Sequence, residues 1–180
     1  RGETAGVYPR HMQMQEVSRV LVTDGLGFWL FADIFNSQKS HIYSVICNTD
    51  PLPCPQEKGY RYPMETGDIR YQVFSSAPTR QYEQQVVSVM TTQEQDKLCR
   101  TCIHTLSTDS QTPQTSQVLF ECFTFAGSEA KVCCQQGMLH LEWNGNVYKL
   151  TVGEYDAGVG RSPVRLRVTR DGAETAEYSL

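Results

Sequence analysis

Hydrophobic residues in this chain recur mostly at every second position and are interrupted by short turn sequences. Residues 17–23 are largely apolar, Asp24-Gly25 offers a turn, and Phe28-Trp29-Leu30-Phe31 follows. This order predicts a hairpin of two long strands. The same β-branched and aromatic character marks four further segments, which we expect to be strands: 41–47, 69–74, 85–90 and 117–124.

The last third of the chain carries the strongest turn signals. Asn144-Gly145 separates two alternating segments, residues 138–143 and 146–152. An Asn-Gly pair suits a type I′ turn, because both of its central residues take positive φ. Asp171-Gly172 is a second signal of this kind, between residues 163–169 and 176–180. Two hairpins in succession predict an antiparallel meander.

One segment has a helical pattern. Thr92 is a candidate N-cap, and Leu98, Cys102 and Leu106 repeat at intervals of four residues. This spacing predicts an amphipathic helix over residues 92–106.

Two segments have the composition of loops. Residues 48–66 are rich in proline and glycine, and residues 107–116 are rich in serine, threonine and glutamine. The expected strands are spread over the whole chain, and its length fits a single β-rich domain over residues 1–180. We therefore predict a mainly β fold: an antiparallel β-sandwich or barrel with one short helix, at about residues 92–106, and two or three disulfides.

Composition excludes several classes of protein. The 180 residues are 39% hydrophobic and 20% charged, as in globular proteins and unlike charged disordered ones. The net charge of −4 argues against a nucleic-acid partner, which needs a clustered basic face. The longest apolar run, residues 27–32, ends at Asp33 and is far shorter than the roughly 20 residues of a membrane helix. We therefore expect no membrane span.

Seven cysteines in 180 residues indicate an oxidising compartment, so we expect a secreted, extracellular protein. Cys133 and Cys134 are adjacent, and neighbours in a strand point to opposite faces, so each should have a different partner. Because the number is odd, one thiol stays free or bonds to another chain. The disulfide candidates are Cys47, Cys54, Cys99, Cys102, Cys122, Cys133 and Cys134.

Zinc is the alternative use of these thiols. Cys99 and Cys102 have the spacing of a zinc knuckle, with His104 close by, but the adjacent pair Cys133-Cys134 is a poor second half of such a site. We therefore expect no metal and no cofactor. The sequence also lacks the motifs that place a nucleophile beside a base, which indicates that the protein is not an enzyme.

Aromatic residues crowd the first half of the chain. Bulky side chains at successive positions from Phe28 to Phe31 predict a strand covered on both faces. One interpretation is an ordinary sheet core. The functional one is a secreted, non-catalytic binding or structural protein that assembles with itself or with a partner chain through residues 28–31. The alternative function is an extracellular carrier that holds a small hydrophobic ligand between β-sheets. The candidate ligand-binding or interface residues are Phe28, Trp29, Phe31, Tyr43 and Tyr71.

Overall fold

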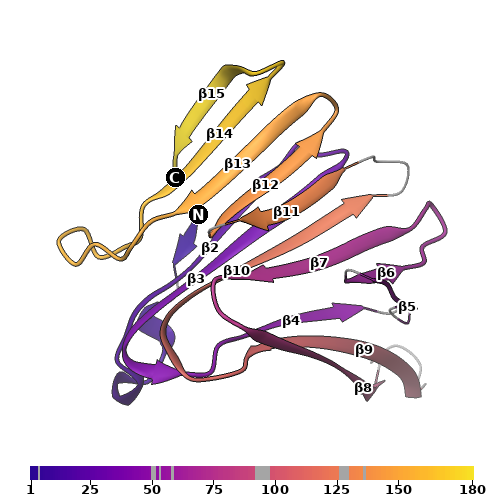
Figure 1. The fold of residues 1–180 in the computed structure, drawn as a ribbon. Coiled ribbons are helices and arrows are strands. Elements are labelled where there is room, and N and C mark those ends of the chain that lie inside the picture. The colour runs from indigo at the N-terminus through magenta and orange to yellow at the C-terminus, as the bar shows by residue number, and fades with distance from the viewer. Residues whose placement is uncertain are drawn as a thin grey trace.

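The protein is built from three antiparallel β-sheets in the computed structural model (Figure 1). The structure describes residues 1–3, 5–49, 52, 54–57, 59–91, 98–125, 130–135 and 137–180, without the side chains of residues 5, 84–91 and 98–104. Two 3₁₀ turns, η1 (Ala5–Val7) and η2 (Arg10–Met12), precede the first long strand. The expectation of a mainly β, antiparallel protein is confirmed.

The largest sheet has seven strands, in the order β1-β2-β3-β10-β7-β6-β5. These strands are β1 (Gly2–Glu3), β2 (Met14–Thr23), β3 (Phe28–His41), β10 (Gln114–Phe125), β7 (Ile69–Ser75), β6 (Tyr60–Tyr62) and β5 (Cys54–Pro55). The predicted hairpin around Asp24-Gly25 is β2–β3, and Gly25 has a φ of +81°.

The other two sheets are smaller. The five-stranded sheet is a meander of β11 (Lys131–Gln135), β12 (Met138–Trp143), β13 (Asn146–Val152), β14 (Val164–Arg170) and β15 (Ala173–Ser179). Asn144, Gly145, Asp171 and Gly172 all have positive φ, which confirms both predicted tight turns. The three-stranded sheet has the order β4 (Ser44–Thr49), β9 (Leu98–Ser110) and β8 (Thr79–Thr91).

The seven-stranded sheet lies between the other two, with the five-stranded sheet above it and β4, β8 and β9 below it in Figure 1. Its upper face packs against the five-stranded sheet in a core that contains Phe28, Leu30 and Phe120 from one side and Leu141 and Leu150 from the other. All five of these side chains are fully buried. We call this cluster the upper core.

The lower face of the seven-stranded sheet contacts β4 and β9 through two smaller clusters. One holds Phe35, Val45 and Leu119, and the other holds Cys47 and Leu106 with tyrosines of β6 and β7. Side chains of β3 alternate between the two faces, as those of any strand do. Its successive residues therefore contribute to both the upper core and the lower face.

The predicted helix over residues 92–106 is wrong for the part that the structure describes. Residues 98–106 belong to β9, and residues 92–97 lie outside the described residues. A spacing of four places Leu98, Cys102 and Leu106 on one face of a helix, but it is also a multiple of two and places them on one face of a strand. The β-branched residues Thr101, Ile103 and Thr105 between them favour the strand.

The predicted loop over residues 107–116 is also mostly strand. β9 continues to Ser110 and β10 begins at Gln114, so the connection is residues 111–113. Composition misleads here because Ser107, Thr108 and Ser110 are buried polar residues. Ser110, for example, accepts a hydrogen bond from the backbone N–H of Tyr43 on its hydroxyl, at 2.9 Å.

The prediction of two or three disulfides is contradicted. Five of the seven cysteines carry free thiols, and the side chains of Cys99 and Cys102 are outside the description. The sheets direct the five to different surroundings. Cys122 is in the upper core, Cys47 is below the seven-stranded sheet, and Cys133 is exposed. The free cysteines are Cys47, Cys54, Cys122, Cys133 and Cys134. The adjacent pair does alternate as expected, because Cys134 packs against the upper core and Cys133 does not.

A buried carboxylate joins the two larger sheets at the start of β14. Glu16 accepts hydrogen bonds from the Ser162 backbone N–H and hydroxyl at 2.9 and 2.8 Å, and from the Asn36 amide at 2.8 Å. It also forms an ion pair with Arg1. Glu16 is 3% exposed, so these donors supply the stabilisation that water no longer gives its charge.

The alternation in the β2–β3 hairpin predicts very different costs for two leucine truncations. Leu30→Ala, at a fully buried position of the upper core, should lower the free energy of unfolding by about 2–5 kcal/mol. Leu21→Ala, on the opposite face and 51% exposed, should cost less than about 1 kcal/mol. Urea denaturation measures both values. Equal losses would contradict the assignment of the two faces.

Candidate functional site

Three charged side chains lie side by side on the lower face of the seven-stranded sheet. Arg19 of β2 donates from Nε to Asp33 Oδ1 at 2.6 Å and from Nη2 to Asp33 Oδ2 at 2.7 Å. The same Nη2 donates to Glu121 Oε1 of β10 at 2.8 Å. The carboxylates are 6% and 3% exposed, whereas the Arg19 side chain is 51% exposed. Arg19 thus lies between the solvent and two buried carboxylates.

Two further polar groups extend this cluster under the sheet. The Tyr71 hydroxyl of β7 donates to Glu121 Oε2 at 2.7 Å. Nearby, the Tyr62 hydroxyl donates to the Cys47 sulfur at 3.8 Å. Burial raises the pKa of both tyrosines and of the Cys47 thiol. Cys47 is therefore held as a neutral thiol, which is a poor nucleophile.

Burial also raises the pKa of Glu121, to about 7, and the neighbouring Asp33 acts in the same direction. The hydrogen bond from Tyr71 and the charge of Arg19 oppose this shift without cancelling it. Burial is the largest cause of the raised pKa, and the second carboxylate adds to it, because one guanidinium faces two acids in a site with little water. Glu121 therefore titrates near neutral pH.

Beside this cluster, an apolar cleft of about 390 Å³ lies between the lower face of the sheet and β4. Aromatic rings from β3 and β10 form much of its wall. Trp29 and Phe125 meet edge to face with centroids 5.8 Å apart, and Phe31 and Phe123 do so at 5.9 Å. The lining residues are Arg19, Trp29, Phe31, Ile46, Cys47, Asn48, Ile69, Glu121, Phe123 and Phe125. We call this space the aromatic cleft.

The aromatic cleft is apolar along its walls and charged at one end. The Arg19 guanidinium lies 5.1 Å from the centre of the Phe31 ring, a cation–π distance. Trp29 and Ile46 are 46% and 58% exposed, and Leu21 on the same face is 51% exposed. Large apolar side chains are thus left open to water around a partly enclosed space, which is how small-molecule sites are built.

The structure brings together some of the predicted site residues and separates others. Trp29 and Phe31 line the aromatic cleft, and Tyr71 supports it through Glu121. Phe28 lies on the opposite face, fully buried in the upper core. Tyr43 stacks on Phe35 in a separate cluster, with ring centroids 4.7 Å apart.

Sequence reasoning missed the charged residues of this site and most of its lining. The available signal is a charge inside an apolar alternating segment. Asp33 continues the side of β3 that holds Phe31, and Glu121 continues the side of β10 that holds Phe123. A buried position that carries a charge needs a partner from another strand, and Arg19 is that partner. The missed lining residues are Arg19, Ile46, Asn48, Ile69, Glu121, Phe123 and Phe125.

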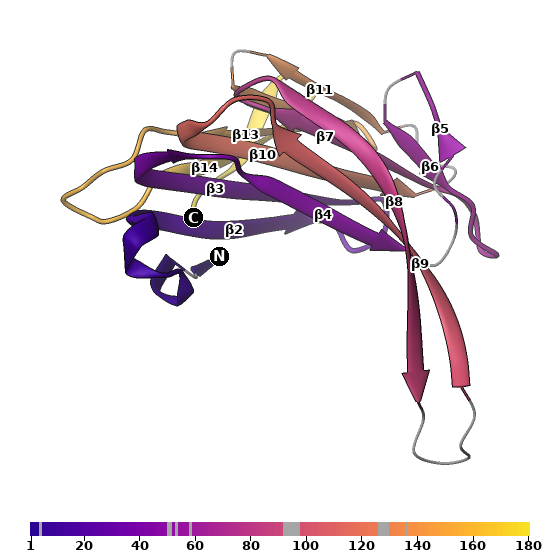
Figure 2. The same cartoon turned by 90° about the horizontal axis from the view of Figure 1, so that it is seen from below.

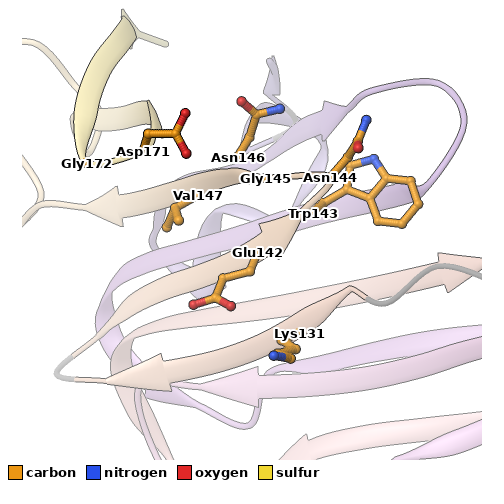
Figure 3. A pocket seen from close by; sticks show the side chains of 9 residues that line it. All are labelled: Lys131, Glu142, Trp143, Asn144, Gly145, Asn146, Val147, Asp171 and Gly172. Atoms are coloured by element: carbon orange, nitrogen blue, oxygen red, sulfur yellow. The ribbon is translucent and has the colours of Figure 1, made fainter.

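A second hollow, of about 810 Å³, lies on the five-stranded sheet near the tight turns Asn144-Gly145 and Asp171-Gly172 (Figure 3). Its lining combines exposed charged residues with backbone of the tight turns. The lining residues are Lys131, Glu142, Trp143, Asn144, Gly145, Asn146, Val147, Asp171 and Gly172. The hollow is wide and mostly polar, so a ligand there would bury little apolar surface and gain little hydrophobic stabilisation. The aromatic cleft is therefore the better candidate site.

The described residues include no group of three or more His, Cys, Asp or Glu side chains placed to hold a metal ion. The same part of the chain has no helix long and apolar enough to cross a membrane. The zinc alternative involves Cys99, Cys102 and His104, whose side chains are outside the description. Comparison with family models and with curated proteins finds no match to this chain.

Glu121 should make the stability of the protein depend on pH in a defined direction. Its folded pKa is raised, so its favourable contribution is present in acid and is lost as the pH rises through about 7. Glu121→Gln keeps the shape without the charge. Relative to wild type, this variant should gain about 1–3 kcal/mol of unfolding free energy between pH 5 and pH 8.

Denaturant titrations at the two pH values measure this gain. Glu142→Gln is the matched control, because Glu142 is exposed on the five-stranded sheet and loses the same charge. The control should keep the same difference from wild type at both pH values. A Glu121→Gln variant that behaves like the control would rule out a buried carboxyl that titrates near neutrality.

Proposed function

We propose that this chain is a non-catalytic binding protein that carries a small hydrophobic ligand in the aromatic cleft. The observation that carries the proposal is an apolar volume of about 390 Å³, partly enclosed by a sheet face and β4. Sites for small molecules span roughly 300–1,000 Å³ and combine apolar walls with a few polar groups. Here the walls are aromatic, and Arg19 and Glu121 are among the polar groups.

The packing of the sheets leaves space for such a ligand on one face of the seven-stranded sheet. The upper core fills the space between the two larger sheets, an arrangement that we propose to describe as a β-sandwich with a third, partial layer. Below the seven-stranded sheet, the partial layer leaves Trp29 and Ile46 at the mouth of the cleft. A ligand would remove these side chains from water, which stabilises the complex by about 25 cal/mol per Å² of apolar surface.

Secretion is part of the proposal, and what supports it is the cysteine content of the sequence. The five described thiols are free, so this support does not extend to disulfides. An extracellular carrier remains the function that we assign to such a chain.

A neutral, fluorescent hydrophobe tests ligand carriage. N-phenyl-1-naphthylamine should bind the wild-type protein at one site with a saturable rise in emission. Ile46→Ala removes part of the cleft wall at a position that is 58% exposed, so folding is little affected. We expect about fivefold weaker binding, from the loss of about 1 kcal/mol of apolar contact.

Ile42→Ala is the matched control, because Ile42 is 48% exposed and does not line the cleft. Its affinity for the probe should equal that of the wild type. The proposal fails if the wild type shows no saturable binding, or if the two alanine variants bind alike.

A second candidate function is assembly, and the β8–β9 hairpin favours it. This hairpin projects from the body of the protein in Figure 2. Its strands pair from Thr79 and Ser110 out to Thr91 and Leu98, but β4 pairs with β9 only from His104 to Asp109. Within the described residues the outer half is therefore a two-stranded ribbon, which is marginally stable alone in water.

The sequence of this outer half is rich in apolar residues, including Val86, Val87, Val89 and Met90 on one strand. Unpaired strand edges bind other strands, and one edge can pair with its own copy around a two-fold axis to close a dimer. We therefore propose a second copy of this chain as the partner of the hairpin. Cys99 and Cys102 lie in the same ribbon, where a bond between chains would make the dimer covalent.

Shortening the hairpin tests assembly. In the variant, Asn-Gly replaces residues 86–103 and joins Gln85 to its cross-strand partner His104. The wild type should sediment as a dimer at micromolar concentration and the variant as a monomer that still binds N-phenyl-1-naphthylamine. A wild type that is monomeric at every concentration, or a variant that remains dimeric, would refute the role of the hairpin.

A further inference from the structure

We propose that the aromatic cleft selects a small apolar cation, a compact hydrocarbon or aromatic body that carries a protonated amine. This inference rests on the proposed function and names the class of its ligand. The evidence is the balance of charge at the polar end of the cleft, together with the rings that surround it.

The charges at the polar end do not cancel. Asp33 and Glu121 are both almost fully buried, and among the described side chains that they contact, Arg19 is the one cation. Two carboxylates against one guanidinium leave an excess of one negative charge when both acids are ionised. An uncompensated charge in a buried site is costly, and a ligand that brings the opposite charge removes that cost.

Glu121 is the carboxylate that a ligand can reach, because it lines the cleft. Each of its oxygens accepts one hydrogen bond, Oε1 from Arg19 and Oε2 from Tyr71. A carboxylate has about four acceptor positions, so each oxygen can accept another hydrogen bond from an ammonium group. A charge-assisted bond of this kind is stronger than one between neutral groups.

An anionic ligand meets the opposite situation. Arg19 already donates to both Asp33 and Glu121. A ligand carboxylate beside Arg19 would therefore be a third carboxylate around one guanidinium, and like charges in a poorly solvated site repel each other. A fatty acid or an acidic aromatic compound is thus disfavoured.

The walls of the cleft favour a cation as well. Trp29, Phe31, Phe123 and Phe125 all line it, and aromatic ring faces carry partial negative charge. Cations within about 6 Å of such rings are attracted to them, most strongly where water is displaced. The apolar body and the charge of one small ligand can therefore both find favourable contacts in the same space.

Three ligands with one naphthalene body isolate the effect of charge. At pH 7.5, 1-naphthylmethylamine is a cation, 1-naphthylmethanol is neutral and 1-naphthoate is an anion. Isothermal titration calorimetry on the full chain should show the amine binding at least tenfold more tightly than the alcohol, and the naphthoate binding most weakly. Binding of the alcohol as tight as that of the amine, or tighter binding of the naphthoate, would overturn the inference.

Glu121→Gln should bring the affinity for the amine to within about twofold of that for the alcohol. Glu142→Gln is the matched control and should keep the full preference for the amine. Alcohol binding shows that the cleft of each variant is intact. If Glu121→Gln does not fold, Asp33→Asn removes the same excess charge and should reduce the preference in the same way.

The amine should also bind more tightly as the pH rises from 6 to 8. The groups that face Glu121 are Arg19 from β2, Asp33 from β3, Tyr71 from β7 and Cys47 from β4. Glu121 itself has a pKa of about 7, so its carboxyl gains a negative charge between pH 6 and pH 8. The amine keeps its positive charge over the same range. A flat pH profile would contradict the part assigned to Glu121.

The outcomes separate the two proposals. If none of the three naphthalene compounds binds, ligand carriage itself fails. If the alcohol binds but the amine gains nothing over it, the aromatic cleft is a hydrophobic site and the selectivity for a cation fails alone.

Discussion

The structure depends on one long strand that must be covered on both faces. β3 is an interior strand of the seven-stranded sheet, between β2 and β10. Its side chains alternate between Phe28 and Leu30 above and Trp29 and Phe31 below. A strand with large apolar residues at successive positions, as at residues 28–31, is stable in water only if both faces are shielded. The five-stranded sheet covers the upper face at Phe28, Leu30, Ala32 and Ile34, which are all buried. The three-stranded sheet covers the lower face in part, and the aromatic cleft lies where that cover ends.

The incomplete cover explains why charges occur in the middle of this sheet. Asp33 and Glu121 share the lower face of the sheet with Phe31 and Phe123, and Arg19 bridges both carboxylates. Replacing this group with apolar residues would give a stable sheet and an ordinary core. The chain instead keeps one more acid than base beside a hydrophobic volume, which links the electrostatics of the fold to the ligand that we propose.

Much of the fold follows from period and turn chemistry, because strands and tight turns are set by neighbours in the sequence. The Asn144-Gly145 and Asp171-Gly172 turns are examples. The helix predicted over residues 92–106 shows the limit of this reasoning, because a spacing of four fits a strand as well as a helix. Pairing with β8 determines that residues 98–106 form a strand. At the candidate site, the run of bulky residues from Phe28 to Phe31 predicts that Trp29 and Phe31 are binding residues. The ion pair of Arg19 and Glu121 joins residues 102 positions apart, so no local pattern could predict it.

The two tryptophans of the chain allow the most direct test of where a ligand binds. Trp29 lines the aromatic cleft, and Trp143 lines the hollow on the five-stranded sheet. A ¹⁵N–¹H correlation spectrum has one indole N–H signal for each, and Trp29→Phe assigns them. On addition of N-phenyl-1-naphthylamine, the account predicts a saturable shift of the Trp29 signal with the Trp143 signal unchanged. A shift of Trp143 alone, or of neither signal, would contradict it.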